Sequence, residues 1–294
     1  LERYKEKIRN EKYSSVTEMI EDIQHLRPSS SKIYNLDELS DAGSDMRETL
    51  LPCGSVMLSK RMREISRHDS LLRLMDVPQL LEGATTFPGA NHTRYEHSLG
   101  TYEMMRRALV TLLRNKYFVT SLSERNVIIA LLGALMSSIV VFPYSYAIQE
   151  IRLQDQDLFS NMERRMLFSK IVMFKKDGEK SIIDLINEKF FSYDITEDEL
   201  SYVVFGAGEH TNIALHNLHF LLSSSIGVRT VDYIIRDAHH IGISCEVDTD
   251  SLFNNLAVVD GEFCLNQRGI SAAEQVIVNR CWMFKRIYWS EPNR

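Results

Sequence analysis

The sequence predicts a mainly helical, all-α fold with one small β-hairpin near residues 258–265. From His97 onward, apolar residues recur at intervals of three and four, which is the period of an α-helix. Residues 127–148 contain no charged residue, as expected for a helix in the core. Near the end of the chain, Asp260-Gly261 separates two short apolar runs, a pattern typical of a β-hairpin.

The first fifty residues contain two further helical patterns. Residues 1–27 alternate charged and apolar groups at helical spacing, and Pro28 with the serines that follow it ends the pattern. A second helix is predicted over residues 35–51, ending at Pro52-Cys53-Gly54.

The chain of 294 residues is long enough to bury a large core, as one large domain or two modest ones. We expect a helical N-terminal extension over residues 1–50 and a main domain over residues 51–294. Because the chain starts at Leu1 rather than Met, it can be a fragment of a longer protein. A main domain truncated at its C-terminal end is a separate expectation.

The net charge of the chain and the spacing of its cysteines exclude some classes of function. A net charge of -6 argues against a general nucleic-acid binder, because such binding depends on a basic surface. The four cysteines have no metal-type spacing and follow no secretory signal, so we expect them to be reduced and the protein to be cytoplasmic.

The uncharged stretch 127–148 has about the length of a membrane span, roughly 20 residues. However, Pro143 and the pair Ser137-Ser138 interrupt it, and its flanks continue as ordinary soluble helix. The sequence therefore predicts a core helix and no membrane.

A polar cluster marks the candidate site. Residues 87–91 (Phe-Pro-Gly-Ala-Asn) predict a loop, which leads into His92, Arg94, Glu96 and His97. His97 is then expected near the first turn of a long helix, where the backbone N–H groups and the helix dipole favour an anion.

Three segments carry a resemblance to a known family. The sequence FPGANHTRYEHSLGTY, preceded by LLRLMDVPQLLEG, resembles the opening motif of the HD-domain phosphohydrolases, closest to their deoxynucleoside triphosphate triphosphohydrolase branch. VDYIIRDAHHIGI at 231–243 and RCWMFKRIYW at 280–289 are similar to two later family segments in the same order. The resemblance implies a helical HD-domain fold, with His97 as the first metal ligand.

The chain departs from this family at the residues that would hold the metal. In ALMSSIVVFPYSY, Ser137 and Ser138 replace the metal-binding His-Asp pair, and Val141 and Tyr146 replace two histidines that assist phosphate chemistry. Arg229 stands where the last metal-binding Asp is expected.

Only His97 remains of the four expected ligands, whereas a hydrolytic metal needs about three protein ligands and an open position for water. Serine hydroxyls are poor ligands, and the guanidinium of Arg229 repels a cation. We therefore expect no metal, no other cofactor and no catalytic residue.

The resemblance also implies a binding pocket that the chain retains. Gln79 matches a family residue that contacts the sugar, and Arg94 matches one that binds a phosphate. Tyr233 and Asp237 match a pair that contacts the sugar 3′-hydroxyl. Arg229 can supply the positive charge that the metal gives in the family, because arginine pairs well with phosphate.

Each of these residues also has a purely structural interpretation. His97 can be an ordinary helix-end histidine, and Arg94 with Glu96 a solvated ion pair of little energetic weight. Asp232, Arg236 and Asp237 have a spacing suited to ion pairs along a helix.

The C-terminal basic segment has two interpretations. Arg280, Lys285 and Arg286 alternate with aromatic residues, so they can contact phosphates. Arginine with aromatic residues is also typical of protein interfaces, and we favour a subunit contact.

These observations favour a catalytically inactive HD-domain protein that binds a nucleotide or phosphate ligand and acts as a regulatory or scaffolding module. Two alternatives stay open: an active phosphohydrolase with unusual metal ligands, and a purely structural oligomerisation unit. We expect a homo-oligomer or a partner protein, no membrane, and no nucleic-acid partner.

Overall fold

The structure is a computed structural model, and it describes residues 33, 35–41, 45–80, 83–113, 122–142, 160–176, 178–206, 212–259 and 262–289. Three parts of the sequence predictions lie outside the described residues: the helix over 1–27, residues 143–148 of the uncharged stretch with the replacement at Tyr146, and the corner Asp260-Gly261.

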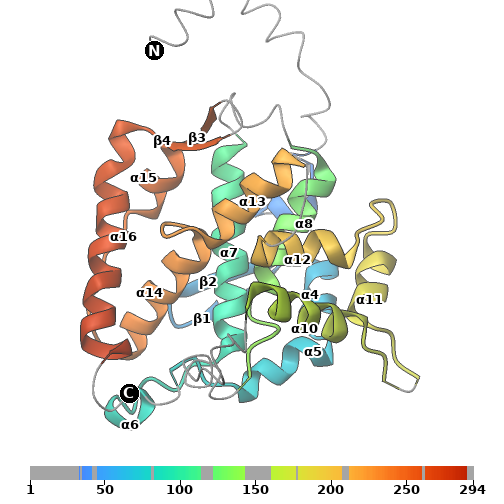
Figure 1. The fold of residues 1–294 in the computed structure, drawn as a ribbon, viewed down its shortest axis with the longest axis horizontal. Coiled ribbons are helices and arrows are strands. Elements are labelled where there is room, and N and C mark those ends of the chain that lie inside the picture. The colour runs from blue at the N-terminus through green and yellow to red at the C-terminus, as the bar shows by residue number, and fades with distance from the viewer. Residues whose placement is uncertain are drawn as a thin grey trace, which may run out of the picture.

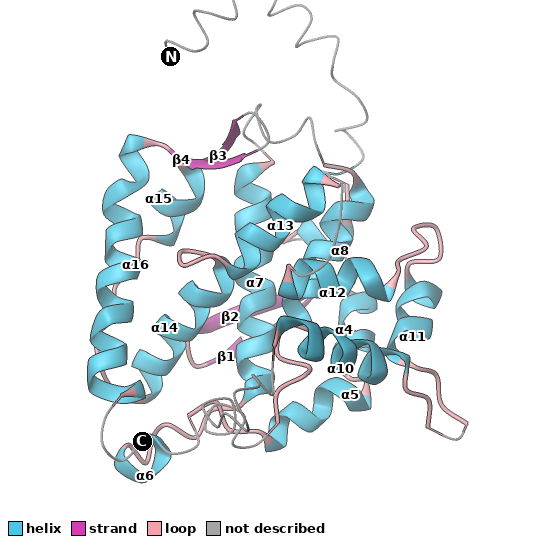
Figure 2. Cartoon of the chain, viewed as in Figure 1, coloured by secondary structure: helices cyan, strands magenta, loops and turns pink. Residues whose placement is uncertain are grey.

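Helices make up most of the described chain, which confirms the predicted fold class (Figure 2). The α-helices are α4 (Lys60–Ser66), α5 (Asp69–Leu72), α6 (Gly83–Thr86), α7 (Arg94–Leu112), α8 (Glu124–Leu135), α10 (Asn161–Met173), α11 (Ile182–Lys189), α12 (Glu197–Phe205), α13 (Ile213–Ser223), α14 (Val228–His240), α15 (Thr249–Asn254) and α16 (Ile270–Met283). Short 3-10 turns are η1 (Asp37–Leu39), η2 (Arg73–Asp76) and η4 (Gln267–Gly269), and a π-helical turn, η5 (Phe284–Tyr288), follows α16.

The other helices are arranged around α7. It packs against α14 and α15 on one side and against α8 on the other, with α16 outside α14, with α12 and α13 against α8, and with α10 against α12 (Figure 1). As the apolar spacing predicts, α7 is long and buries Leu99, Tyr102, Met105 and Leu109 in the core. The side chain of Thr93 caps its first turn by accepting a hydrogen bond from the backbone N–H of Glu96.

The first part of the uncharged stretch is a core helix, as predicted, but the helix is shorter than the stretch. Ser123 caps α8, and every residue from Asn126 to Leu135 is buried. The helix ends at Leu135 and a buried turn over residues 136–140 follows it. None of the described helices is long and apolar enough to cross a bilayer.

The predicted C-terminal hairpin is present. Strand β3 (Leu256–Val259) pairs antiparallel with β4 (Glu262–Leu265), and Val259 lies opposite Glu262. The flanks of the Asp-Gly corner therefore pair as the sequence indicates.

The prediction of a helix over residues 35–51 is wrong. The described part of this segment holds the short turn η1 and strand β1 (Arg47–Leu51), which pairs antiparallel with β2 (Gly54–Leu58). The two strands join through Pro52-Cys53, and Gly54 has a φ of +121°, a backbone conformation that favours glycine.

The position of this hairpin depends on contacts made by distant residues. Val56 and Leu58 lie in the core, and the backbone N–H of Met57 donates to a carboxylate oxygen of Glu103 on α7 at 3.1 Å. The expected domain boundary between residues 50 and 51 falls inside β1, and Leu39, before it, is also part of the core.

Candidate functional site

His97 lies in the first turn of α7, and its side chain is 3% exposed. Its Nδ1 is 2.7 Å from Oδ2 of Asp232 on α14. Burial lowers the pKa of His97, while Asp232 raises it and Arg94 lowers it further. The ring is therefore neutral near pH 7, with its proton on Nδ1 toward the carboxylate and its Nε2 left as an acceptor.

Asp232 is shared between His97 and Arg236. Two hydrogen bonds, of 3.1 and 2.8 Å, join the guanidinium of Arg236 to the carboxylate of Asp232 one turn earlier on α14. Burial alone would raise the pKa of Asp232, but Arg236 and His97 lower it. This confirms the predicted ion pair along the helix, and it leaves Asp232 as a charged carboxylate that orients His97.

The same arginine connects α14 to the start of α7. Nη1 of Arg236 lies 2.8 Å from Oε1 of Glu96, which also lies 3.0 Å from Nε2 of His240. Arg94 is buried and donates to the backbone carbonyl of Gln79 at 3.2 Å. Because Arg94 is buried, it does not belong to a solvated ion pair, and that alternative is wrong.

Asp237 and Tyr233 lie on the neighbouring face of α14. One oxygen of Asp237 is 2.8 Å from Nε2 of His92, and the other accepts a hydrogen bond of 2.5 Å from the hydroxyl of Tyr288. The ring of Tyr233 lies 6.5 Å from that of His97, edge to face. The structure thus brings Tyr233 next to His97, and it gives the carboxylate of Asp237 two protein partners.

Gln79 lies on the segment that enters α7. Its backbone N–H donates to the carbonyl of His92 at 2.9 Å, and the backbone N–H of Arg94 donates to the carbonyl of Val77 at 2.8 Å. The side chain of Gln79 is buried, and among the described residues its Oε1 has no hydrogen-bond partner. These contacts fix Gln79 and Arg94 side by side.

Ser137 and Ser138 lie in the buried turn that follows α8. Arg73 holds this turn, because its guanidinium donates to the carbonyls of Ile139 and Val141, the second bond being 2.9 Å long. The hydroxyl of Ser137 is buried and has no partner in the part of the chain that the structure describes.

Arg229 is half-buried in the first turn of α14, one turn before Tyr233. Its positive charge acts on His219 of α13. Burial is the main cause that lowers the pKa of His219, and the charge of Arg229 lowers it further. Arg229 therefore interacts electrostatically with α13, although it belongs to α14.

Two of the C-terminal basic residues lie over aromatic rings of their own segment. The guanidinium of Arg280 lies over the ring of Phe284 at 5.6 Å, and that of Arg286 lies over Trp282 at 4.8 Å. Within the described residues, no hydrogen bond or ion pair links Arg280, Lys285 or Arg286 to the cluster around His97. Trp282 and Trp289 are more than half exposed, and the subunit contact expected here stays a prediction.

Sequence reasoning missed four contributors to the site: Asp232 as the partner of His97, His92 and Tyr288 as partners of Asp237, and Arg73 as the support of the Ser137 turn. The spacing of Asp232 and Arg236 indicated an ion pair. No local signal relates Asp232 to His97, because 135 positions separate them.

Comparisons with known proteins agree with this fold. No protein-family model matches the chain. Protein MG461 of Mycoplasma genitalium, which is uncharacterised, is 27% identical over 242 residues, which cover 78% of this chain and 52% of that protein. The putative HD domain-containing protein L394 of Acanthamoeba polyphaga mimivirus is 21% identical over 249 residues, 80% of this chain and 52% of that protein.

The deoxynucleoside triphosphate triphosphohydrolase SAMHD1 of Mus musculus is 25% identical over 247 residues, 72% of this chain and 37% of that enzyme. The crystal structure of a phosphohydrolase from Bacteroides thetaiotaomicron has a TM-score of 0.64 and 22% identity, over 84% of this chain and 55% of that one. At that identity the structural likeness concerns the fold alone. The chain spans about half the length of the curated relatives it matches. The motif around His97, the two later segments and the HD domain-containing and triphosphohydrolase relatives support the HD-domain phosphohydrolase superfamily for this chain, and the structural neighbour supports its helical fold.

Proposed function

We propose that this domain is a catalytically inactive HD-domain protein, a pseudo-phosphohydrolase, that binds a nucleotide or another phosphate-bearing ligand and serves as a regulatory or scaffolding module. One observation carries the proposal: of the four residues expected to hold the metal, His97 is kept, while Ser137, Ser138 and Arg229 stand at the other three positions.

The donor set at these positions does not fit a divalent metal. The Nε2 of His97 is available as a ligand, since its Nδ1 proton points to Asp232. Ser137 and Ser138 offer neutral hydroxyls, and Arg229 offers only N–H donors. Because about three protein ligands are needed to hold a hydrolytic metal and activate its water, hydroxide should not form here.

The retained polar groups support a phosphate-bearing ligand. Arg94 is buried beside His97 and Gln79, and Arg229 adds a second cation at the start of α14. A buried guanidinium presents several donors in a plane, which suits the oxygens of a phosphate.

Two buried polar atoms also support a ligand. Neither Oε1 of Gln79 nor Oγ of Ser137 has a hydrogen-bond partner among the described residues. An unpaired buried polar atom costs about 1–3 kcal/mol, so few are found in folded proteins without a reason. A bound ligand that hydrogen-bonds to either atom would remove the cost at that atom.

The name of one relative supports the ligand class. SAMHD1 of Mus musculus is a deoxynucleoside triphosphate triphosphohydrolase, and it aligns with 72% of this chain. We therefore expect a deoxynucleoside triphosphate to be the first ligand to try. Its sugar would approach Tyr233 and the carboxylate of Asp237, which can still accept a further hydrogen bond beside His92 and Tyr288.

Isothermal titration calorimetry with a panel of deoxynucleoside triphosphates, in a buffer that contains EDTA, tests the proposal. We expect saturable binding by the wild type, and binding about 10- to 100-fold weaker in Arg94→Gln, because a hydrogen bond to a charged group contributes about 1.5–3 kcal/mol. The control is Arg268→Gln, which removes an exposed arginine in η4 and should leave the affinity unchanged.

Two results would contradict the proposal. Absence of binding by the wild type would exclude the ligand class. Release of phosphate that depends on manganese, and stops when a chelator is added, would instead support the active phosphohydrolase.

A further inference from the structure

Three zinc-type donors converge next to the His97 cluster. The Sγ of Cys53, a carboxylate oxygen of Glu96 and a ring nitrogen of His240 all lie within 4.8 Å of one another. The three residues come from the β1–β2 turn, the first turn of α7 and the last turn of α14. We propose that Cys53, Glu96 and His240 form a zinc-binding site that is separate from the four positions of the HD motif.

The chemistry of the three donors favours zinc over harder cations. Thiolate, imidazole and carboxylate are the groups that bind Zn²⁺ in proteins, whereas Mg²⁺ and Ca²⁺ take oxygen donors. Three protein ligands with an open fourth position form a common zinc arrangement. All three residues are half-buried, so the donors are sheltered yet reachable from solvent.

Cys53 lies among three carboxylates and one cation, Arg236, whose individual effect on the thiol is larger than that of any one carboxylate. Burial raises the pKa of the Cys53 thiol to about 11, and Asp232, Glu96 and Asp237 raise it further while Arg236 opposes them. Several carboxylates near one sulfur disfavour a bare thiolate, and they stabilise a thiolate that carries a divalent cation. Zinc binding would therefore replace the thiol proton, which leaves to solvent as the Zn–S bond forms.

Among the described residues, Arg236 is the cation whose charge acts on Cys53, and this charge is paired. Two hydrogen bonds join it to Asp232, and its Nη1 lies 2.8 Å from Oε1 of Glu96. Carboxylates that ligate a metal are themselves commonly hydrogen-bonded, and such bonds orient them. Arg236 would thus hold Glu96 in place while zinc replaces the hydrogen bond between Glu96 and His240.

The ring of His240 is held in position from its other side. It stacks on the ring of His92, with the centroids 4.2 Å apart and the planes 11° from parallel. His92 is itself fixed by its hydrogen bond of 2.8 Å to Asp237. A ligand that is already oriented loses little conformational entropy when the metal binds.

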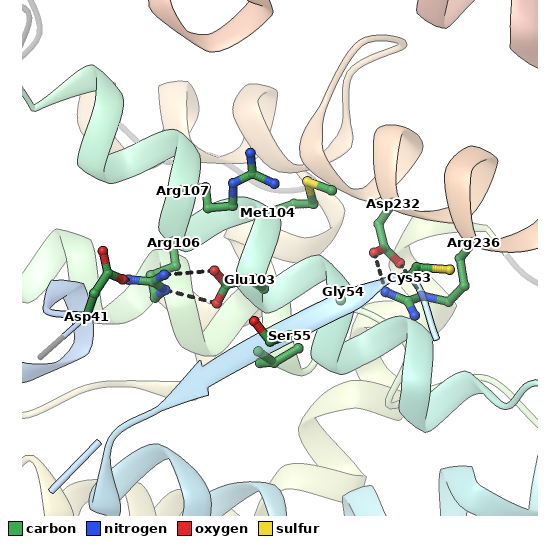
Figure 3. A pocket seen from close by; sticks show the side chains of 12 residues that line it. Asp41, Cys53, Gly54, Ser55, Glu103, Met104, Arg106, Arg107, Asp232 and Arg236 are labelled. Atoms are coloured by element: carbon green, nitrogen blue, oxygen red, sulfur yellow. Dashed lines mark hydrogen bonds and ion pairs between the residues drawn. The ribbon is translucent and has the colours of Figure 1, made fainter. Parts of the chain in front are cut away.

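A cavity adjoins the proposed site on the side of Cys53, while Glu96 and His240 do not line it. Its volume is about 370 Å³, and Cys53 and Gly54 line it together with Met104, Asp232 and Arg236. Figure 3 shows Cys53, Asp232 and Arg236 close together at one end of this cavity, with Glu103 and Arg106 toward the other. Water or a small donor molecule could therefore complete the tetrahedron from the Cys53 end.

Cobalt spectroscopy on the whole chain tests the site. Cobalt(II) takes tetrahedral zinc sites, absorbs in the visible, and adds a near-ultraviolet charge-transfer band when a thiolate binds it. We expect both bands in the wild type, their loss when Zn²⁺ is added, and loss of the charge-transfer band in Cys53→Ser. His240→Gln should lose the saturable visible band.

Cys245→Ser is the matched control. Cys245 is half-buried like Cys53, and burial raises the pKa of its thiol to about 11 as well, but it belongs to no group of metal donors in the described residues. The bands should survive this substitution. A charge-transfer band that persists in folded Cys53→Ser, or no saturable band in the wild type, would overturn the proposal.

A second measurement needs no variant. The wild type is treated with iodoacetamide, with and without Zn²⁺, and the modified cysteines are identified by mass spectrometry. Zinc should abolish the modification of Cys53 and leave that of Cys245 unchanged. Equal modification of Cys53 in both samples would overturn the proposal even if Cys53→Ser fails to fold. Neither measurement depends on nucleotide binding.

Discussion

Gly100 of α7 lies directly against Arg236 of α14. A Cβ at residue 100 would stand 1.9 Å from Nη2 of Arg236 and 2.1 Å from Oδ1 of Asp232, so the two helices approach this closely only because residue 100 has no side chain. The buried ion pair occupies the space that a methyl group would need.

We therefore expect Gly100→Ala to destabilise the protein, although alanine favours a helix over glycine by about 1 kcal/mol. Overpacking a buried site costs about 1–3 kcal/mol, and here the obstacle is a charged pair that is difficult to displace. Urea denaturation measures the change in the free energy of unfolding.

Gly133→Ala on α8 is the matched control. A Cβ there would meet Cγ1 of Val203 at 2.9 Å, which is a methyl group on a neighbouring helix and not an ion pair. The control should cost less than Gly100→Ala. If Gly100→Ala proved neutral or stabilising, the close contact between α7 and α14 would be contradicted.

Asp232 should be among the most sensitive residues of the fold. Asp232→Asn removes the charge that balances Arg236 and weakens the acceptor for His97. Removing one partner of a buried ion pair costs about 3–5 kcal/mol, because the other charge stays buried. Asp250→Asn removes the partner of Arg107 in an exposed pair and should cost about 1 kcal/mol at most. Chemical denaturation measures the free energy of unfolding of both variants. Equal losses of stability would contradict the assignment of Asp232 to a buried ion pair.

The first turn of α12 should make stability depend on pH through Glu199. Arg125 and the cap residue Thr196 both donate to this carboxylate, with distances of 2.7 Å to each side chain. Burial raises the pKa of Glu199, but Arg125 and Thr196 outweigh it and hold the pKa below its ordinary value of 4.5. The stabilisation is therefore present above about pH 4.5 and is lost as the pH falls through the lowered pKa.

We expect Glu199→Gln to destabilise the protein by about 1–2 kcal/mol at pH 7, a value discounted for the partial exposure of the pair. At pH 3 the difference from wild type should shrink. Urea denaturation at both pH values measures it, with Glu274→Gln on the exposed side of α16 as the control. A difference that stays constant between pH 7 and pH 3 would show that the charge of Glu199 is not the cause.

Elements that depend on a local sequence pattern could be predicted from the sequence alone. The apolar spacing after His97 gives α7, and the Asp-Gly corner gives the pairing of β3 with β4. The β1–β2 hairpin was missed, because Leu50 in β1 is 80% exposed and the strand has no clean alternation of apolar and polar residues. Its place is set by contacts that only the folded chain makes, such as that between Met57 and Glu103.

The candidate site likewise has one part that local sequence predicts and another part that it does not. The residues from His92 to His97 form one local cluster that spacing reveals. The partners of that cluster lie on α14 and η5, and no rule of local sequence relates His97 to Asp232 or Asp237 to Tyr288. The sequence does not indicate Cys53 as a metal ligand, because a lone cysteine has no metal-type spacing. Only the fold brings it to Glu96 and His240.

Restoring the missing donors should restore metal binding at the HD positions. The variant Ser137→His, Ser138→Asp, Arg229→Asp would give His97 three further ligands and remove the cation that repels a metal. His97 is already oriented by Asp232, so its Nε2 needs no rearrangement. We expect the triple variant to retain Mn²⁺ through gel filtration in the presence of excess Mg²⁺, as measured by elemental analysis, while the wild type retains none.

Manganese is the better probe, because it prefers oxygen and nitrogen donors and competes poorly for the thiolate of Cys53. Arg229→Asp alone is the control: it removes the repulsion but leaves two serines in place of the His-Asp pair, so it should bind far less metal than the triple variant. A triple variant that is folded by circular dichroism, yet holds no more Mn²⁺ than Arg229→Asp, would mean that the turn after α8 does not present residues 137 and 138 toward His97. The loss of these side chains would then not explain the inactivity proposed for this domain.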